Sequence, residues 1–308
     1  MKVRLIHETI SIIHPVATIG IFDGVHVGHR FILDELVQKA KKHGGESVVV
    51  TLWPHPRLIL DTYIQNFKLL HTRDEKIREL ERSGIDQLVF VPFDKEIASF
   101  TACEFVQNYL VDRLGVELLL VGYDNRFGRD RKGDPDGLAR CASQNKFRIE
   151  KLPEFNPEFG KVNSTLIREA VQQGELELAE RMLGYHYYLS GSIVEGNHLG
   201  RQMGFPTANI HPNNPYKLIP MNGVYAIRME LKGKLYNGML NIGFRPTIDS
   251  SSAVKTIEAH LFDVSGDFYD EPVVIHFVKR VRDEMKFRGL EALKQQLGKD
   301  KKLIQALL

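Results

Sequence analysis

The sequence is poor in cysteine and has no long hydrophobic run. Its two cysteines, Cys103 and Cys141, share no CxxC or metal-ligand spacing, so we expect both to be packing residues that need no partner. No stretch approaches the roughly 18 uncharged apolar residues of a membrane-spanning helix. The segment 1–15 lacks the apolar block and the cleavage site of a signal peptide. These absences predict a cytoplasmic protein that does not enter membranes.

A strong charge of one sign is also absent. The formal net charge is +2 at pH 7, which gives no basic field for general nucleic-acid binding. The sequence contains no internal repeat and no low-complexity segment. Its 43% hydrophobic and 26% charged residues are typical of a globular protein. We therefore expect small-molecule partners, no nucleic acid and no membrane; the sequence indicates no oligomeric state.

The hydrophobic pattern divides the chain of 308 residues into two domains. Before about residue 185, short apolar runs alternate with helix-period segments, which predicts a parallel sheet. These runs are 17–22, 48–53, 88–93 and 118–123. Beyond it, strands alternate with turns and predict an antiparallel barrel or sandwich. These strands are 224–231, 235–242, 257–262 and 273–278, followed by an amphipathic run, 290–308, that predicts one or two helices.

Local signals mark the ends of helices in the first half. Thr72 with Glu75 and Thr101 with Glu104 have the spacing of capping boxes. Glycines stand where helices should stop, at Gly44, Gly84 and Gly115. We place the domains at residues 1–182 and 183–308.

The segment 20–29 (GIFDGVHVGH) lies between the first predicted strand and a helix. Ligands of an open parallel sheet gather at the carboxyl ends of its strands. His26 and His29 offer imidazole donors beside a helix N-terminus, and Gly28 lets a phosphate approach the backbone. The alternative is that both histidines are ordinary loop or core residues. Their position between strand and helix favours a phosphate site.

Three further segments stand where ligands of such a sheet are expected. They are 53–56 (WPHP), 121–128 (VGYDNRFG) and 162–168 (VNSTLIR). Ser164 and Thr165 offer hydroxyls and Arg168 a guanidinium to phosphate oxygens. Capping of a helix over 166–173 is the alternative role of the hydroxyls. For 53–56 the alternative is a turn that ends a strand.

With these motifs, the first half resembles prokaryotic FAD synthetase domains of the nucleotidyltransferase superfamily, which carry HxGH and a later segment similar to ISSTxIR. Ile21 and Asn163 depart from the family pattern at positions without an assigned role. The resemblance implies that the phosphate of FMN attacks the α-phosphorus of ATP and releases pyrophosphate, so that catalysis is positioning and charge stabilisation. It places His26 and His29 at the transferring phosphate, and Ser164, Thr165 and Arg168 at the pyrophosphate. The other residues that it assigns to the nucleotide or flavin are Gly20, Phe22, Asp23, Gly24, Gly28, Gly122, Asp124, Arg126 and Phe127.

The second half contains 200–209 (GRQMGFPTAN), which resembles the GRxxGFPTAN signature of riboflavin kinases. Gly196, Gly200 and Gly204 can turn backbone amides toward ATP, while Thr207 and Asn209 offer the hard oxygen ligands that Mg²⁺ prefers. The alternative is a glycine-rich turn followed by an edge strand. The resemblance adds Arg201, Pro206 and Asn241 to the ATP and flavin site.

The downstream segments 241–247 (NIGFRPT) and 257–261 (IEAHL) match the same family in order. By this resemblance Glu258 is the general base that accepts the proton of the riboflavin 5′-hydroxyl. An isolated glutamate in a strand would otherwise face solvent. We interpret Arg280, Arg282 and Glu284 as a solvated charge run, with framing of a flavin pocket as the alternative.

The resemblance spans almost the entire chain and implies one bifunctional enzyme that uses riboflavin, FMN and ATP with Mg²⁺. The predicted fold is an α/β nucleotidyltransferase domain with a Rossmann-like parallel sheet, followed by an antiparallel β-barrel kinase domain with a C-terminal helix. Three alternatives stay open: an aminoacyl-tRNA synthetase-like adenylating enzyme, a non-catalytic flavin sensor, and a chain in which only one half is active.

Overall fold

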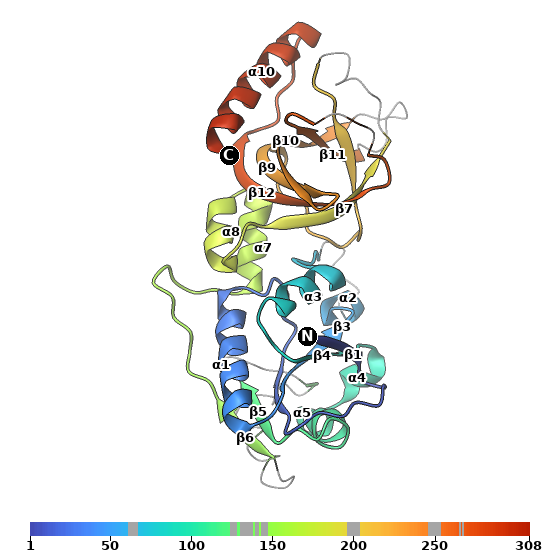
Figure 1. The fold of residues 1–308 in the computed structure, drawn as a ribbon, viewed down its shortest axis with the longest axis vertical. Coiled ribbons are helices and arrows are strands. Elements are labelled where there is room, and N and C mark those ends of the chain that lie inside the picture. Colours follow the sequence, from blue (N-terminus) through green and yellow to red (C-terminus); the bar gives the residue numbers. More distant parts are fainter. Residues whose placement is uncertain are drawn as a thin grey trace. The chain divides into compact units, whose positions relative to one another are not determined.

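The computed structural model describes residues 1–60, 67–123, 128–129, 138, 142, 147–195, 204–245, 254–264, 266 and 268–308. The chain forms two compact units, Met1–Asn163 and Ser164–Leu308 (Figure 1). In its described part, no helix combines the length and the apolar character needed to cross a membrane.

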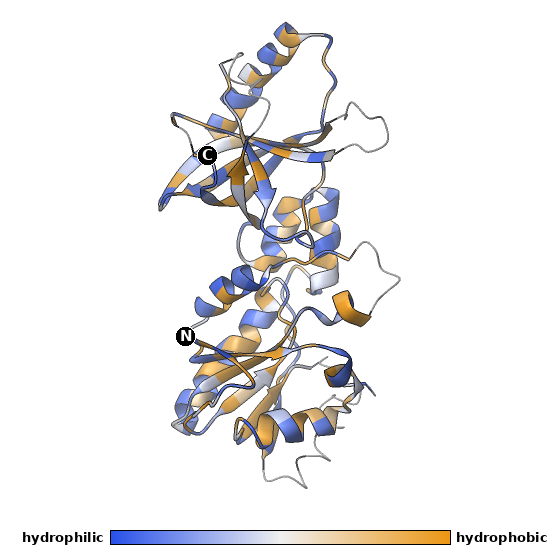
Figure 2. Ribbon diagram, turned by 90° about the vertical axis from the view of Figure 1, so that its right-hand side faces the viewer, coloured by the Kyte–Doolittle hydropathy of each residue, from blue (hydrophilic) through white to orange (hydrophobic). Residues whose placement is uncertain are grey.

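The first unit is built on one parallel sheet with the strand order β1–β4–β3–β2–β5–β6. Its strands are β1 (Lys2–Leu5), β2 (Val16–Ile19), β3 (Ser47–Trp53), β4 (Gln87–Pro92), β5 (Leu118–Val121) and β6 (Arg148–Lys151). Val48 and Val50 pack on one face of the sheet and Val49 on the other. Because both faces are covered, the central strands are continuous apolar runs rather than alternating ones, as the hydrophobic colouring of Figure 2 shows.

Helices cover both faces of this sheet. They are α1 (Val27–His43), α2 (Pro56–Leu60), α3 (Arg73–Glu81), α4 (Lys95–Ser99), α5 (Ala102–Phe105) and the π-helical turn η1 (Val106–Val111). Leu33 and Leu36 of α1 pack in the cluster on one face, and Phe105 and Leu110 pack in the cluster on the other. The expected doubly wound α/β domain is confirmed.

The predicted helix signals are present, but the prediction that Cys103 needs no partner is wrong. Both capping boxes form at the starts of α3 and α5. The three glycines expected to stop helices all have positive φ, between 65° and 72°: Gly44, Gly84 and Gly115. Cys103, however, is disulfide-bonded. Cys141 lies outside the described residues.

In the second unit, antiparallel strands close into a barrel in the order β10–β11–β8–β7–β12–β9. The strands are β7 (Tyr188–Val194), β8 (Ala208–Pro212), β9 (Gly223–Leu231), β10 (Lys234–Arg245), β11 (Val254–Leu261) and β12 (Pro272–Arg282). Of the two predicted architectures, barrel and sandwich, the chain adopts the barrel. β8 pairs with both β7 and β11, so the strand that contains Asn209 is not an edge strand.

The described part of this unit also contains the helices α7 (Ser164–Gln173), α8 (Leu176–Leu183) and α10 (Leu290–Leu307). The backbone N–H of Met221 donates to the carbonyl of Val171 at 3.3 Å, which joins α7 to the barrel segment before β9. α8 packs on β12. The compact unit therefore begins at Ser164, earlier than the domain start at residue 183 expected from hydrophobic periodicity.

α10 lies on the outside of the barrel (Figure 1). Ile304 packs in a cluster with Val224 and Met239. Asp300, which is 2% exposed, accepts hydrogen bonds from Nε and Nη2 of Arg282 at 3.1 and 2.7 Å. Arg282 therefore fastens α10 to β12 and is not part of a solvated charge run.

Candidate active sites

The first candidate site lies at the switch point of the parallel sheet. From β2 the chain continues to β3 and β4 on one side, and β5 then pairs with the other side of β2. Open α/β sheets bind ligands outside the carboxyl ends of strands at such a point. The turn after β2 carries the predicted phosphate residues. After β5, a Cβ on Gly122 would lie 3.1 Å from Cδ1 of Ile32, so α1 packs directly against this glycine.

The turn between β2 and α1 has an unusual backbone. Phe22, Gly24 and Val25 all have positive φ, at 49°, 86° and 35°. Non-glycine residues adopt this region at a cost, and such strain is concentrated at functional sites in proteins. A Cβ on Gly20 would lie 2.9 Å from the Phe22 ring, so this glycine makes room for it. The surrounding contacts must therefore hold the turn in place.

Asp23 is one of these contacts. It is 2% exposed, and its two carboxylate oxygens accept hydrogen bonds from the backbone N–H groups of Leu70 and His71, at 3.1 and 2.9 Å. Asp23 thus ties the turn to the segment before α3. The resemblance assigned Asp23 to the nucleotide site; in the structure its carboxylate binds these two backbone N–H groups.

His26 and His29 are brought together at the start of α1. His26 is the N-cap, and its Nδ1 accepts a hydrogen bond from the backbone N–H of His29 at 3.2 Å. The two rings stack with centroids 3.6 Å apart and planes 14° apart. Since Nδ1 of His26 is an acceptor, the neutral ring carries its proton on Nε2, where it can donate to an anion. A Cβ on Gly28 would touch the His26 ring at 3.3 Å.

The environment keeps His29 uncharged. Its pKa lies well below the ordinary value, first because it is buried, and then because His26, Lys76 and His71 add positive charge nearby. Its Nδ1 is buried and has no hydrogen-bond partner in the described residues. The site therefore presents a neutral His29 imidazole beside His26 and the N–H groups of a helix N-terminus, an arrangement that stabilises phosphate charge.

Other predicted residues of the first site are placed less directly. α7 begins at Ser164, so Ser164 and Thr165 form its first turn, earlier than the helix start expected at residue 166. The guanidinium of Arg168 donates to the carbonyl of Ser164 at 3.0 Å. These residues belong to the second compact unit. Asp124, Arg126 and Phe127 lie outside the described residues.

The segment 53–56 links β3 to α2. His55 is buried, and its Nδ1 accepts a hydrogen bond from the backbone N–H of Arg57 at 3.1 Å. Its ring packs on Phe67 with centroids 4.7 Å apart. These contacts are those of a strand-to-helix turn.

The second candidate site is a row of polar residues across the barrel. Asn241 on β10 is the register partner of Glu258 on β11, and Glu258 is the partner of Asn209 on β8. Register partners on neighbouring strands project from the same face. Asn241 also pairs with Val224, which packs in the cluster beneath α10. The row therefore lies on the outer face of the barrel, next to the part that α10 covers.

Glu284 also lies over this face. A Cβ on Gly243 would lie 1.9 Å from Oε1 of Glu284 and 3.1 Å from Nδ2 of Asn241. The glycine in the segment 241–247 therefore leaves space for a second carboxylate near the row. From the sequence, Glu284 was expected to belong to a solvated charge run. Its side chain is exposed, and it lies beside Asn241.

His260 holds the FPTAN segment against β11. It is 6% exposed, and its Nδ1 donates to the carbonyl of Pro206 at 2.8 Å. Its ring packs edge-on against Phe205 and Phe262. Burial lowers its pKa, so the ring is neutral and its proton lies on the donating nitrogen. Because residue 260 is on the same face of β11 as Glu258, His260 sets the distance between the signature segment and that carboxylate.

We predict that His260→Phe weakens kinase activity while leaving FAD formation from supplied FMN unchanged. The ring packing is retained, but the Pro206 carbonyl loses its donor; the net contribution of such a hydrogen bond is about 0.5–1.5 kcal/mol, or about 2- to 12-fold in kcat/KM for ATP. Steady-state kinetics of FMN formation measure this. His211→Ala, which removes an exposed imidazole from β8, is the matched control. Equal kinetics for His260→Phe and wild type would contradict the positioning role.

Mg²⁺ would have to be held by oxygen ligands of the signature segment. Among the described residues, no group of three or more His, Cys, Asp or Glu side chains is arranged to hold a metal. Thr207 is exposed and Asn209 is half-buried beside Glu258, and a hydroxyl and an amide oxygen suit this ion. Gly204 has a φ of 81°, and the carbonyl of Pro206 accepts the hydrogen bond from His260. Gly196, Gly200 and Arg201 lie outside the described residues.

Family models match both halves of the chain. The model described as FAD synthetase covers residues 11–166, and the riboflavin kinase model covers residues 183–308. The bifunctional riboflavin kinase/FMN adenylyltransferase of Bacillus subtilis is 36% identical over 313 residues, covering 96% of this chain and 96% of the relative. That of Escherichia coli K12 is 37% identical over 286 residues, covering 92% of this chain and 90% of the relative.

A solved structure has the same fold over nearly the whole length. It comes from Streptococcus pneumoniae, is described as a macrolide-efflux protein, and matches with a TM-score of 0.86 at 30% identity, covering 94% of each chain. The match of the first half to FAD synthetases removes the aminoacyl-tRNA synthetase alternative. Since both family models match and the relatives are similar over nearly the whole chain, the chain belongs to the family of bifunctional riboflavin kinase/FMN adenylyltransferases.

Proposed function

We propose that the chain phosphorylates riboflavin to FMN in its C-terminal half and adenylylates FMN to FAD, with release of pyrophosphate, in its N-terminal half. The observation that carries the proposal is the coincidence of each family match with a polar constellation. The stacked His26–His29 pair lies in the first match, and the Asn209–Glu258–Asn241 row lies in the second. A flavin sensor would require neither arrangement.

In the first site, we assign phosphate stabilisation to His26 and His29. The Nε2 proton of His26 and the free N–H groups of α1 would bind the α-phosphate as the FMN phosphate attacks it. Ser164, Thr165 and Arg168 would hold the departing pyrophosphate. The remaining residues proposed for this site are Gly20, Phe22, Asp23, Gly24, Gly28, Gly122, Asp124, Arg126 and Phe127.

In the second site, we assign the role of general base to Glu258. A carboxylate in hydrogen-bond reach of the riboflavin 5′-hydroxyl accepts its proton and makes that weak nucleophile competent. Thr207 and Asn209 would hold Mg²⁺, which when bound neutralises charge on the phosphates of ATP. Asn241, which lies on the other side of Glu258 from Asn209, would help to orient the phosphates of ATP. Gly196, Gly200, Arg201, Gly204 and Pro206 are proposed to line the ATP and flavin pocket.

The domain boundary proposed here, between residues 182 and 183, is supported by the start of the riboflavin kinase match. Because both reactions consume ATP, we also propose that the enzyme works in the cytoplasm.

The test is a time course with purified protein, riboflavin, Mg²⁺ and ATP labelled at either the α- or the γ-phosphate. Label from the γ-position should appear first in FMN and then in FAD, with one ADP per FMN. Label from the α-position should appear in FAD alone, with one pyrophosphate per FAD. Label in FMN but not in FAD would show that only the kinase half is active. If riboflavin gives no labelled flavin, supplied FMN decides: FAD formed from it would show that only the adenylyl-transfer half is active, and no FAD would favour the sensor.

A further inference from the structure

Lys76 is a buried lysine beneath the turn that carries the histidine pair. Its side chain is 1% exposed, and Nζ donates to the carbonyl of Ile21 at 2.6 Å. Thr51 donates to the same carbonyl at 3.2 Å. The ammonium also lies 5.2 Å from the centroid of the Trp53 ring, within the range of a cation–π contact. A cation is costly to bury, so its contacts indicate a specific role.

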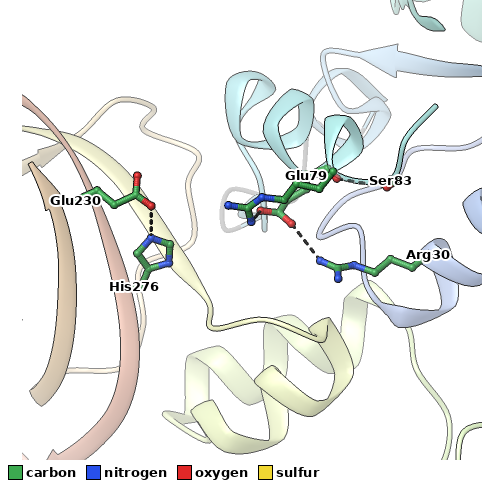
Figure 3. A network of polar contacts seen from close by, with 6 residues as sticks. Arg30, Glu79, Ser83, Glu230 and His276 are labelled. Atoms are coloured by element: carbon green, nitrogen blue, oxygen red, sulfur yellow. Dashed lines mark hydrogen bonds and ion pairs between the residues drawn. The ribbon is translucent and has the colours of Figure 1, made fainter. Parts of the chain in front are cut away.

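The buried face of α3 is charged. Glu75, Lys76 and Glu79 are each at most 2% exposed. Glu75 is used in the capping box with Thr72. Glu79 accepts hydrogen bonds from Arg30 of α1 at 3.2 Å and from Arg82 at 2.7 Å; Figure 3 shows Arg30 reaching Glu79. These contacts fix α3 against α1, and so hold Lys76 in place beside the start of α1.

We propose that Lys76 is a positioning residue for adenylyl transfer, which holds the strained turn through the Ile21 carbonyl and sets a fixed positive charge beneath His26 and His29. The inference rests on the adenylyl-transfer function proposed above. Ile21 lies two residues after the end of β2 and immediately precedes Phe22, the first residue of the turn with positive φ. The hydrogen bond from Lys76 to the Ile21 carbonyl fixes the path of the backbone toward His26, the N-cap of α1.

The charge of Lys76 reaches the histidine pair. It is one of the causes of the lowered pKa of His29, so it helps to keep that imidazole neutral. The same charge favours an anion at the N-terminus of α1, because fixed positive charge in a site shielded from water acts strongly on a phosphate. Lys76 would therefore contribute to catalysis without touching the substrate.

The pKa of Lys76 itself is lowered to about 8, first by burial, with Asp23 acting in the opposite direction. The other titratable or charged groups on the elements packed around it are His26, His29, Arg30, His71, Glu75 and Glu79. With this pKa the ammonium is charged below about pH 8 and neutral above it. A neutral amine can still donate to Ile21, so only the charge is lost as pH rises.

The test compares wild type, Lys76→Met and Lys76→Arg in FAD formation from FMN and ATP across pH 6.5–9.5. We expect kcat/KM of the wild type to fall above about pH 8, because this ratio reports the ionisation of the free enzyme. Lys76→Met should lower kcat about 100-fold or more at pH 7, with a small change in KM for FMN. Lys76→Arg should retain activity within about tenfold and lose the alkaline decline, since guanidinium stays charged.

Two controls separate this outcome from misfolding. Lys41→Met removes an exposed lysine from α1 and should behave like wild type. FMN formation from riboflavin by the same preparations should be unchanged in all variants. Full FAD formation by Lys76→Met, or an alkaline decline in Lys76→Arg identical to that of wild type, would overturn the inference. A wild type that forms no FAD at any pH would instead contradict the proposed function.

Discussion

Glu258→Gln is expected to abolish FMN formation from riboflavin while leaving FAD formation from supplied FMN intact. Glutamine preserves the shape of the side chain and its place between Asn209 and Asn241, but it cannot accept the 5′-hydroxyl proton. Removal of a general base lowers kcat by about 10²–10⁴-fold. Steady-state assays of each partial reaction, with product separation by chromatography, measure both effects.

The matched control for this variant is Glu291→Gln, which neutralises an exposed carboxylate in the first turn of α10. It should retain both activities. If Glu258→Gln kept the kinase turnover of wild type, the assignment of Glu258 as base would be wrong. Glu284, the second carboxylate beside Asn241, would then be the next residue to test.

His29→Ala is expected to have the converse effect, with FAD formation lost and FMN formation spared. The imidazole stacks on His26 and faces the helix start where the transferring phosphate is proposed to bind. Loss of one preorganised donor to a developing anion lowers kcat by about 10²–10³-fold. Because the variant keeps the His29 backbone N–H, the N-cap hydrogen bond to His26 should survive.

His7→Ala, which removes an exposed imidazole from the same unit, is the control for His29→Ala. It should form FAD as wild type does. A folded His29→Ala variant that had lost both activities would show that the two sites depend on each other, against the separation of the two family matches along the chain.

Much of the fold followed from local sequence signals. The capping boxes at Thr72 and Thr101 and the glycine stops specify contacts within a few residues, so they could be recognised without the tertiary structure. The apolar run around Val49 also lies within a few residues, so a strand of a parallel sheet could be predicted from it. The strands β1, β6, β7 and β8 carry weaker patterns and were not predicted as strands. Their place depends on pairing with strands distant in sequence.

The motifs of the candidate sites could be recognised in the sequence. The residues whose contacts fix those motif segments in position could not be predicted. Charges at Glu75, Lys76 and Glu79 would ordinarily mark the solvent face of a helix, and only packing against α1 and the β2 turn reveals that they are buried. His260 lies in the matched segment 257–261, but its hydrogen bond to Pro206 joins positions 54 residues apart, so no role could be predicted for it. No local pattern could have indicated either contact.

The proposition that two separate sites act in sequence is tested most directly by mixing two variants. His29→Ala alone should convert riboflavin to FMN only, and Glu258→Gln alone should leave riboflavin unchanged. Together, with Mg²⁺ and ATP, they should produce FAD, because FMN released by the first protein is a substrate of the second. If each variant retained its own partial reaction and the mixture still formed no FAD, two independent sites linked by free FMN could not explain the enzyme.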